Sequence, residues 1–96
     1  MNLNIILKEK REEILKIAAK HGAYNVRIFG SVARDEADAE SDVDILIDAG
    51  PKRTPWFPGG LIVDLEELLG RKVDVVTAKG LRKRIQERVL KEATPL

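Results

Sequence analysis

A glycine–serine pair and two nearby aspartates are the residues of this chain best suited to chemistry. Gly30 and Ser31 are followed, after ten intervening residues, by Asp42-Val43-Asp44. A glycine lets the backbone turn sharply and approach a phosphate closely, and a serine hydroxyl can contact the same phosphate. Carboxylate oxygens, together with substrate phosphates, suit Mg²⁺. The two motifs together indicate a site that holds a nucleoside triphosphate by its phosphates.

The aspartates belong to a segment, residues 42–47, whose alternation predicts a strand. One face carries Val43, Ile45 and Ile47, and the other carries Asp42, Asp44 and Leu46. Side chains two residues apart on a strand point the same way, with Cα atoms roughly 6.8 Å apart. Asp42 and Asp44 can therefore converge on two metal ions, which together clamp the attacking and leaving oxygens of an in-line displacement.

A third carboxylate is expected from Asp74. Residues 72–77 form a predicted strand with Val73 and Val75 on one side and Asp74 on the other. From that position Asp74 could bind the catalytic metal and help to accept the acceptor's proton. The alternative is an exposed strand aspartate, although aspartate is disfavoured in strands.

The remaining pattern predicts the elements that position these residues. A helix is expected over 5–20, ended by His21-Gly22, and a strand over 24–29 leads into Gly30. Residues 31–37 should form a short helix with Ser31 as its cap. Helices are expected at 61–69, ended by Gly70, and at 81–92, and residues 48–60 read as a long loop.

Length and composition limit the possibilities further. Ninety-six residues with a net charge of +1 predict one domain, 1–96, without the basic footprint of a nucleic-acid-binding protein, so direct nucleic-acid binding is not expected. The absence of cysteine excludes thiol chemistry and fits a reducing cytoplasm. Residues 1–48 carry 7 basic and 10 acidic side chains, a net −3, so metal ions would have to bridge the acidic motif and a polyphosphate.

Other residues leave alternatives open. Arg34 is either a phosphate contact or a solvated helix charge. Trp56 and Phe57 either staple the following helix to the core or contact a partner. The cations of the last helix are expected to form a solvated face, since Lys83/Glu87 and Glu87/Lys91 are spaced as helical ion pairs.

The ordered motifs, Gly30-Ser31, Asp42-Val43-Asp44 and Leu-Leu-Gly-Arg-Lys-Val-Asp-Val-Val at 68–76, resemble the minimal nucleotidyltransferases (MNT) of the DNA polymerase β superfamily. The resemblance implies an α+β, two-layer fold, with a small mixed sheet of about three strands and helices packed on one face. It implies Asp42, Asp44 and Asp74 as catalytic and Mg²⁺-binding residues, and Gly30, Ser31 and Arg34 as triphosphate contacts.

The resemblance also implies a partner. Proteins of this kind transfer AMP from ATP, in some cases to a tyrosine, and are typically antitoxins of HEPN-type toxins. Since 96 residues leave no room for an acceptor-binding domain, we expect the acceptor surface to come from such a toxin in a hetero-oligomer. A non-catalytic antitoxin that neutralises its partner by binding, and an ATP-binding sensor, remain as alternatives.

Overall fold

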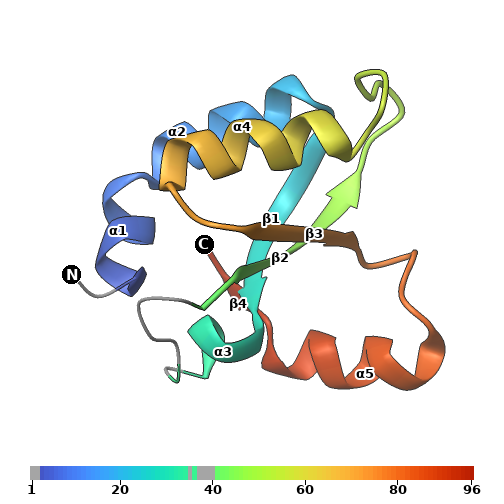
Figure 1. The fold of residues 1–96 in the computed structure, drawn as a ribbon. Helices are drawn as coiled ribbons and strands as arrows, with labels where there is room; N and C mark the ends of the chain where they lie inside the picture. The colour runs from blue at the N-terminus through green and yellow to red at the C-terminus, as the bar shows by residue number, and fades with distance from the viewer. Residues whose placement is uncertain (1–2, 35, 37–40) are drawn as a thin grey trace.

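The computed structural model describes residues 3–34, 36 and 41–96 of the chain, drawn in Figure 1. Helices and strands alternate along the sequence. In order, they are α1 (Leu3–Glu9), α2 (Arg11–Lys20), β1 (Ala23–Phe29), α3 (Gly30–Ala33), β2 (Val43–Ala49), α4 (Gly59–Leu69), β3 (Val73–Thr77), α5 (Lys83–Glu92) and β4 (Thr94–Pro95). None of the helices in the described ranges is long and apolar enough to cross a membrane.

The strands form one mixed sheet in the order β3-β2-β1-β4. β1 pairs antiparallel with β2 and with β4, and β2 pairs parallel with β3. The parallel pair requires a crossover connection, which α4 supplies. The predicted mixed α+β fold is thus confirmed. The sheet has a fourth strand because the short segment Thr94–Pro95 returns to pair with Arg27 and Ile28 of β1.

Helices α2 and α4 form the layer that covers one face of the sheet, and α3 and α5 lie on the other side (Figure 1). The core between the sheet and the α2–α4 layer includes Ile14, Ala18, Val43, Ile45, Ile47, Leu61 and Leu65. Because β3 and β4 are the two edges of the sheet, the connection through α5 has to cross its width. Leu46, on the face opposite this core, is also fully buried, so that face is open only in part.

Several helix boundaries differ from the prediction, including the starts of α1, α4 and α5, each by two residues. The first helix is two, α1 and α2, separated at Lys10; no glycine or proline marks this break, and the burial of both Leu7 and Ile14 shows that packing decides it. α3 begins at Gly30 with Phe29 as its N-cap, so the prediction that Ser31 caps this helix is wrong. α3 ends at Ala33, and residues 35 and 37 lie outside the described residues. Gly70 ends α4 in the left-handed conformation, as predicted.

Candidate active site

Two of the predicted site aspartates face each other across the parallel strand pair. Asp44 of β2 and Asp74 of β3 are register partners, and so are the preceding residues Val43 and Val73. Both valines are buried in the core, so the aspartates lie on the opposite face of the sheet. Asp42 stands two residues before Asp44 and is exposed, as is Asp74, whereas Asp44 is partly buried. The fold therefore gathers all three carboxylates at one end of the sheet.

The described residues balance the negative charges at this end only in part: the charge of Arg34 acts on Asp44, but none of these residues forms an ion pair with the three aspartates. Partial burial raises the pKa of Asp44 above its usual value, and the nearby charges of Asp74 and Asp42 raise it further. In the part of the chain that is described, no side chain donates a hydrogen bond to any of the three carboxylates. A bound cation would relieve this repulsion, and the oxygen donors fit Mg²⁺. Among the described residues, however, no three acidic or histidine side chains already form a metal cluster.

At this end of the sheet, Gly30 packs against the side chain of Asp44. Its φ of +74° lies in the left-handed region that favours glycine. A Cβ at this position would overlap the carboxylate of Asp44, which packs directly against the Cα. Phe29, the residue before it, is the β1 register partner of Asp44. Glycine is therefore required both by the turn and by the close approach of the carboxylate.

Ser31 lies on α3, directly after Gly30, and Arg34 follows the end of this helix. The Arg34 guanidinium forms ion pairs with Glu36, at 3.1 Å, and with Glu92. The hydrogen bonds that Arg34 donates to the Glu92 and Glu36 carboxylates raise the pKa of Arg34. The Ser31 hydroxyl has no hydrogen-bond partner within the described ranges, so it is available to a ligand.

Glu92 is a site residue that sequence analysis missed. Its carboxylate accepts a hydrogen bond from the Gly30 N–H, at 3.2 Å between N and Oε2, and another from Arg34. The hydrogen bond from Arg34 is the largest cause that lowers the pKa of Glu92. Glu92 is 62 residues from Gly30 in the sequence, and no local pattern marks it. Only the return of α5 to the end of β1 brings it to the site.

Two contacts hold the strands that carry the aspartates. The Val73 N–H donates to the Glu66 carboxylate of α4 at 3.1 Å, and the Val43 N–H donates to the Lys72 carbonyl at 3.0 Å. Both bonds fall one residue before the facing aspartates. They fix the starting register of β3 against β2, and with it the relation between Asp44 and Asp74.

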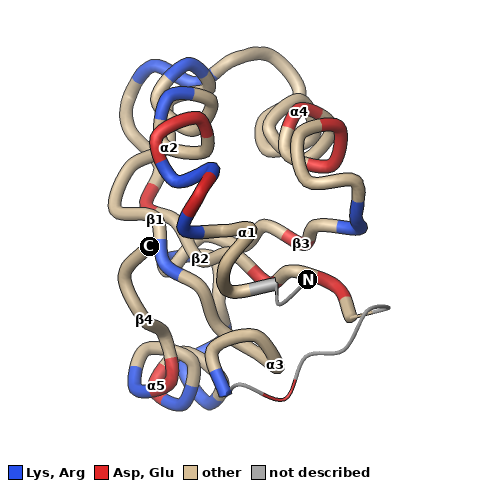
Figure 2. Tube along the Cα trace, turned by 90° about the vertical axis from the view of Figure 1, so that its left-hand side faces the viewer, with Lys and Arg blue, Asp and Glu red and all other residues tan. Residues whose placement is uncertain are grey.

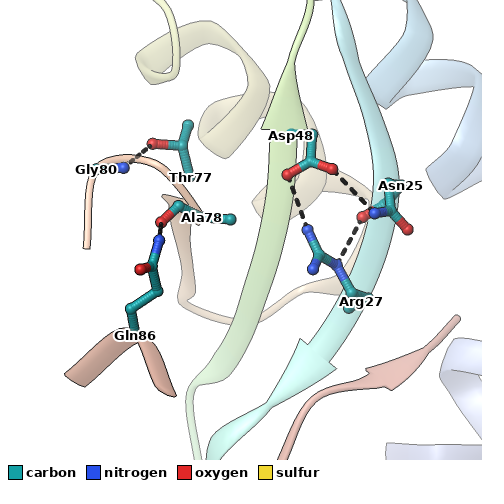
Figure 3. Close-up of polar contacts among 7 residues, drawn as sticks. All are labelled: Asn25, Arg27, Asp48, Thr77, Ala78, Gly80 and Gln86. Atoms are coloured by element: carbon teal, nitrogen blue, oxygen red, sulfur yellow. Dashed lines mark hydrogen bonds and ion pairs between the residues drawn. The ribbon is translucent and has the colours of Figure 1, made fainter. Parts of the chain in front are cut away.

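The opposite end of the sheet carries a different polar cluster. Figure 3 shows Arg27 of β1 bonded to the Asp48 carboxylate, with N and O 3.0 Å apart, while the Asn25 amide donates to the same carboxylate at 2.9 Å. Asn25 has a positive φ of 52° at an irregularity in the β1–β2 register. Since Arg27 neutralises Asp48, this aspartate lies on the site-bearing strand but is not available as a metal ligand.

The two aromatic residues of the loop before α4 lie in different environments. Phe57 packs against the core, whereas Trp56 is 90% exposed at a φ of +69°. Packing against the core, one of the two alternatives for these residues, thus holds for Phe57 and not for Trp56. His21 anchors the same loop by hydrogen bonds of 2.7 Å to Thr54 and to Asp64 of α4.

The cations of α5 are exposed. Figure 2 marks their positions along this helix in blue. The expected ion pairs of Glu87 with Lys83 and Lys91 are absent from the described residues. Val89 is the buried residue of the helix, and Glu92 is the one that reaches the site.

A glycine turn packed against Asp44, with Asp74 as the register partner of Asp44 on a small mixed sheet, fits a nucleotidyltransferase domain. The model of the nucleotidyltransferase domain family matches residues 7–96, and the chain belongs to this family. It is therefore a nucleotidyltransferase of the minimal type that the sequence motifs predict.

Two relatives by sequence carry names that fit this family. The chain is 39% identical over 93 residues to a Methanocaldococcus jannaschii protein named as a candidate protein adenylyltransferase, covering 97% of this chain and 96% of the relative. It is 35% identical to the protein adenylyltransferase MntA of Thermococcus cleftensis, covering 93% of this chain and 86% of the relative.

Solved structures confirm the fold. The chain superimposes on a candidate minimal nucleotidyltransferase with a TM-score of 0.86 and 47% identity, covering 100% of this chain and 97% of the other. It also matches a chain of a toxin–antitoxin complex with AMP-PNP, with a TM-score of 0.75 and 20% identity, covering 88% of this chain and 69% of that one. At this identity the second match speaks for the fold alone.

Proposed function

We propose that this protein is a Mg²⁺-dependent protein adenylyltransferase, which transfers AMP from ATP to a tyrosine hydroxyl of a partner protein. The observation that carries the proposal is the facing pair Asp44 and Asp74, with Asp42 alongside and Gly30 packed against Asp44. Named relatives that are protein adenylyltransferases support the choice of nucleotide and of a protein acceptor. The family match over residues 7–96 supports treating residues 1–96 as one domain.

In this proposal each residue acts on a particular part of the substrates. The Gly30 N–H, the Ser31 hydroxyl and the Arg34 guanidinium bind the β- and γ-phosphates, and Asp42, Asp44 and Asp74 hold Mg²⁺. A Mg²⁺ ion held by these carboxylates would supply electrostatic stabilisation of the charge that develops during the transfer. The acceptor oxygen attacks the α-phosphorus, the bond to the pyrophosphate oxygen breaks, and Asp74 accepts the acceptor's proton.

We further propose that the partner is the toxin of a HEPN/MNT pair and that this chain is its antitoxin. The match to a chain of a toxin–antitoxin complex and the relationship to MntA support this role. Among the described residues, the exposed cations of α5 form no ion pair, and the charge of Arg88 acts on Glu92, so this helix offers a basic surface to an acidic acceptor. A cytoplasmic location, where ATP and Mg²⁺ are abundant, goes with this proposal.

The test is a transfer assay with the protein encoded beside this chain as acceptor. The partner should gain label from α-labelled ATP only when Mg²⁺ is present, and mass spectrometry should place one AMP on a tyrosine. Asp42→Asn combined with Asp44→Asn should abolish the label. A matched control is Glu12→Gln plus Glu13→Gln, which removes two acidic charges from the exposed side of α2 and should leave transfer intact.

The outcomes separate catalysis from the alternatives. An unlabelled partner, or a partner labelled equally well by the double aspartate variant, would refute the proposed reaction. If that variant still protects cells from the partner, neutralisation by binding alone would replace it. If ATP shifts the melting temperature but no pyrophosphate is released with any acceptor, the domain would be an ATP sensor.

A further inference from the structure

Glu92 occupies two of the groups that the proposed function assigns to ATP. One carboxylate oxygen accepts the Gly30 N–H, and the other pairs with the Arg34 guanidinium. The Glu92 side chain is 21% exposed and that of Arg34 is 44% exposed, so the pair lies at the rim of the site. No residue other than Glu92, within the described ranges, bridges the glycine turn and the arginine.

The two donors that Glu92 occupies, the Gly30 N–H and the Arg34 guanidinium, suit a phosphate as well as a carboxylate. A guanidinium with a neighbouring backbone N–H presents several donors to two oxygens of one anion. Carboxylate and phosphate are the two anionic groups that arginine binds in this way. Glu92 therefore uses the same donors that a phosphate group of the nucleotide would use.

The backbone of Glu92 is fixed beside the site. Val89, one helical turn earlier, is buried, and the Ala93 N–H donates to its carbonyl at 2.8 Å. Immediately afterwards β4 pairs with β1, and the Leu96 N–H donates to the Val26 carbonyl at 3.1 Å. At the other end of α5, the Gln86 amide donates to the Ala78 carbonyl at 2.6 Å (Figure 3). A rotation of the Glu92 side chain can thus vacate the donors without moving the helix.

We propose that Glu92 lowers the affinity for ATP by binding the phosphate donors in the nucleotide-free protein, and that the triphosphate displaces it. This inference rests on the proposed function, which assigns those donors to ATP. Displacement costs the two hydrogen bonds of the carboxylate, and the departing negative charge stays beside the incoming polyphosphate. Both effects oppose binding. When the side chain is made neutral, the charge repulsion disappears and the hydrogen bonds become weaker.

The experiment is calorimetric titration with AMP-PNP and Mg²⁺ of the intact protein and three variants. Glu92→Gln keeps the shape of the side chain and its carbonyl acceptor but removes the charge. It should bind AMP-PNP about three- to tenfold more tightly than the unmodified protein, in keeping with the modest energy of a partly exposed ion pair. Glu87→Gln makes the same change on the exposed side of α5 and should have no such effect.

The third variant addresses the mechanism. Glu92→Asp keeps the charge but shortens the side chain by one methylene, so that it can no longer reach both donors. Its affinity should lie between those of Glu92→Gln and the unmodified protein. Thermal melting of each variant establishes that it is folded. If Glu92→Gln does not fold, Glu92→Asp still tests the inference.

Three results would overturn or redirect the inference. If Glu92→Gln binds AMP-PNP more weakly, Glu92 positions Arg34 for the nucleotide and does not compete with it. If Glu92→Gln and Glu87→Gln bind equally, Glu92 has no part in binding. Neither result contradicts the proposed function, which the transfer assay tests separately. If no form of the protein binds AMP-PNP, the proposed function fails, and the inference fails with it.

Discussion

Asp44 and Asp74 face each other at the same register position of two parallel strands, and no ion pair within the described part of the chain neutralises them. The two buried valines that precede them fix this relation, because Val43 and Val73 must both point into the core. The protein thus holds like charges together at a cost in stability. Such a cost is expected where the charges serve a ligand.

Asp44→Asn should therefore impair transfer and stabilise the fold. We expect transfer to fall by about 100-fold or more, since a metal ligand is lost. The raised pKa of Asp44 means that its contribution to stability is present at low pH and is lost as pH rises through the folded-state pKa. At pH 7 the variant should melt about 2–4 °C higher than the unmodified protein, whereas near pH 3 the two should melt alike.

Asp48→Asn is the matched control for that experiment. Asp48 lies on the same strand, and it accepts bonds from Arg27 and Asn25. The same chemical change should here lower the stability at pH 7, by about 1–3 kcal/mol, because a hydrogen-bonded charge pair is broken. Equal effects of the two substitutions on the melting temperature would contradict the assignment of Asp44 as a repelled carboxylate.

Gly30→Ala should be far more damaging than Gly70→Ala. Both glycines have positive φ values, 74° and 66°, so each substitution carries a backbone cost of about 1–2 kcal/mol. Only at Gly30 would the new Cβ overlap another group, the Asp44 carboxylate; at Gly70 nothing lies within 4 Å. Chemical denaturation should show the larger loss for Gly30→Ala, and transfer should be lost only in that variant. Similar unfolding free energies and activities for the two would refute this packing argument.

Asp64→Asn should reduce stability at neutral pH. It should also make the free energy of unfolding less dependent on pH in the acidic range. The hydrogen bond from His21 lowers the pKa of Asp64 below its usual value of 3.8. A lowered pKa gives stability that is present above about pH 4 and is lost as pH falls through the folded-state value. Urea unfolding at pH 7, 4 and 2.5 should therefore show a deficit for the variant that vanishes at the lowest pH.

Glu67→Gln supplies the control for the acid series, because it removes an exposed carboxylate from the same helix, α4. It should change the free energy of unfolding by no more than about 0.5 kcal/mol at every pH, as is usual for surface substitutions. A deficit of Asp64→Asn that persists at pH 2.5 would mean that packing, and not the charge of Asp64, stabilises this contact.

Trp56→Ala and Phe57→Ala should differ although they are neighbours. Trp56 is 90% exposed, so its removal should change the unfolding free energy by no more than about 0.5 kcal/mol. Phe57 packs against the core, and its truncation should cost about 2–3 kcal/mol, less than for a fully buried phenylalanine. Thermal melts of the two variants test this difference. A large loss for Trp56→Ala would show that the indole has a packing role.

The sequence by itself determined which side chains leave the core. Alternation with a period of two predicted that Asp44 and Asp74 point away from the buried valines, and the structure agrees. Gly70 likewise marked the end of α4, because a left-handed residue can be recognised locally. These properties depend on neighbours in the sequence, and local patterns are sufficient to predict them.

Only the tertiary structure decided what those side chains meet. The pairing of Asp44 with Asp74, the hydrogen bond of Glu92 to the Gly30 N–H, and the break at Lys10 all depend on contacts between distant segments. The Glu92 contact, for example, forms because β3 and β4 lie at opposite edges of the sheet and α5 must span the distance between them. The sequence therefore predicted the carboxylates, whereas the folded chain supplied their register and the glutamate that occupies the neighbouring donors.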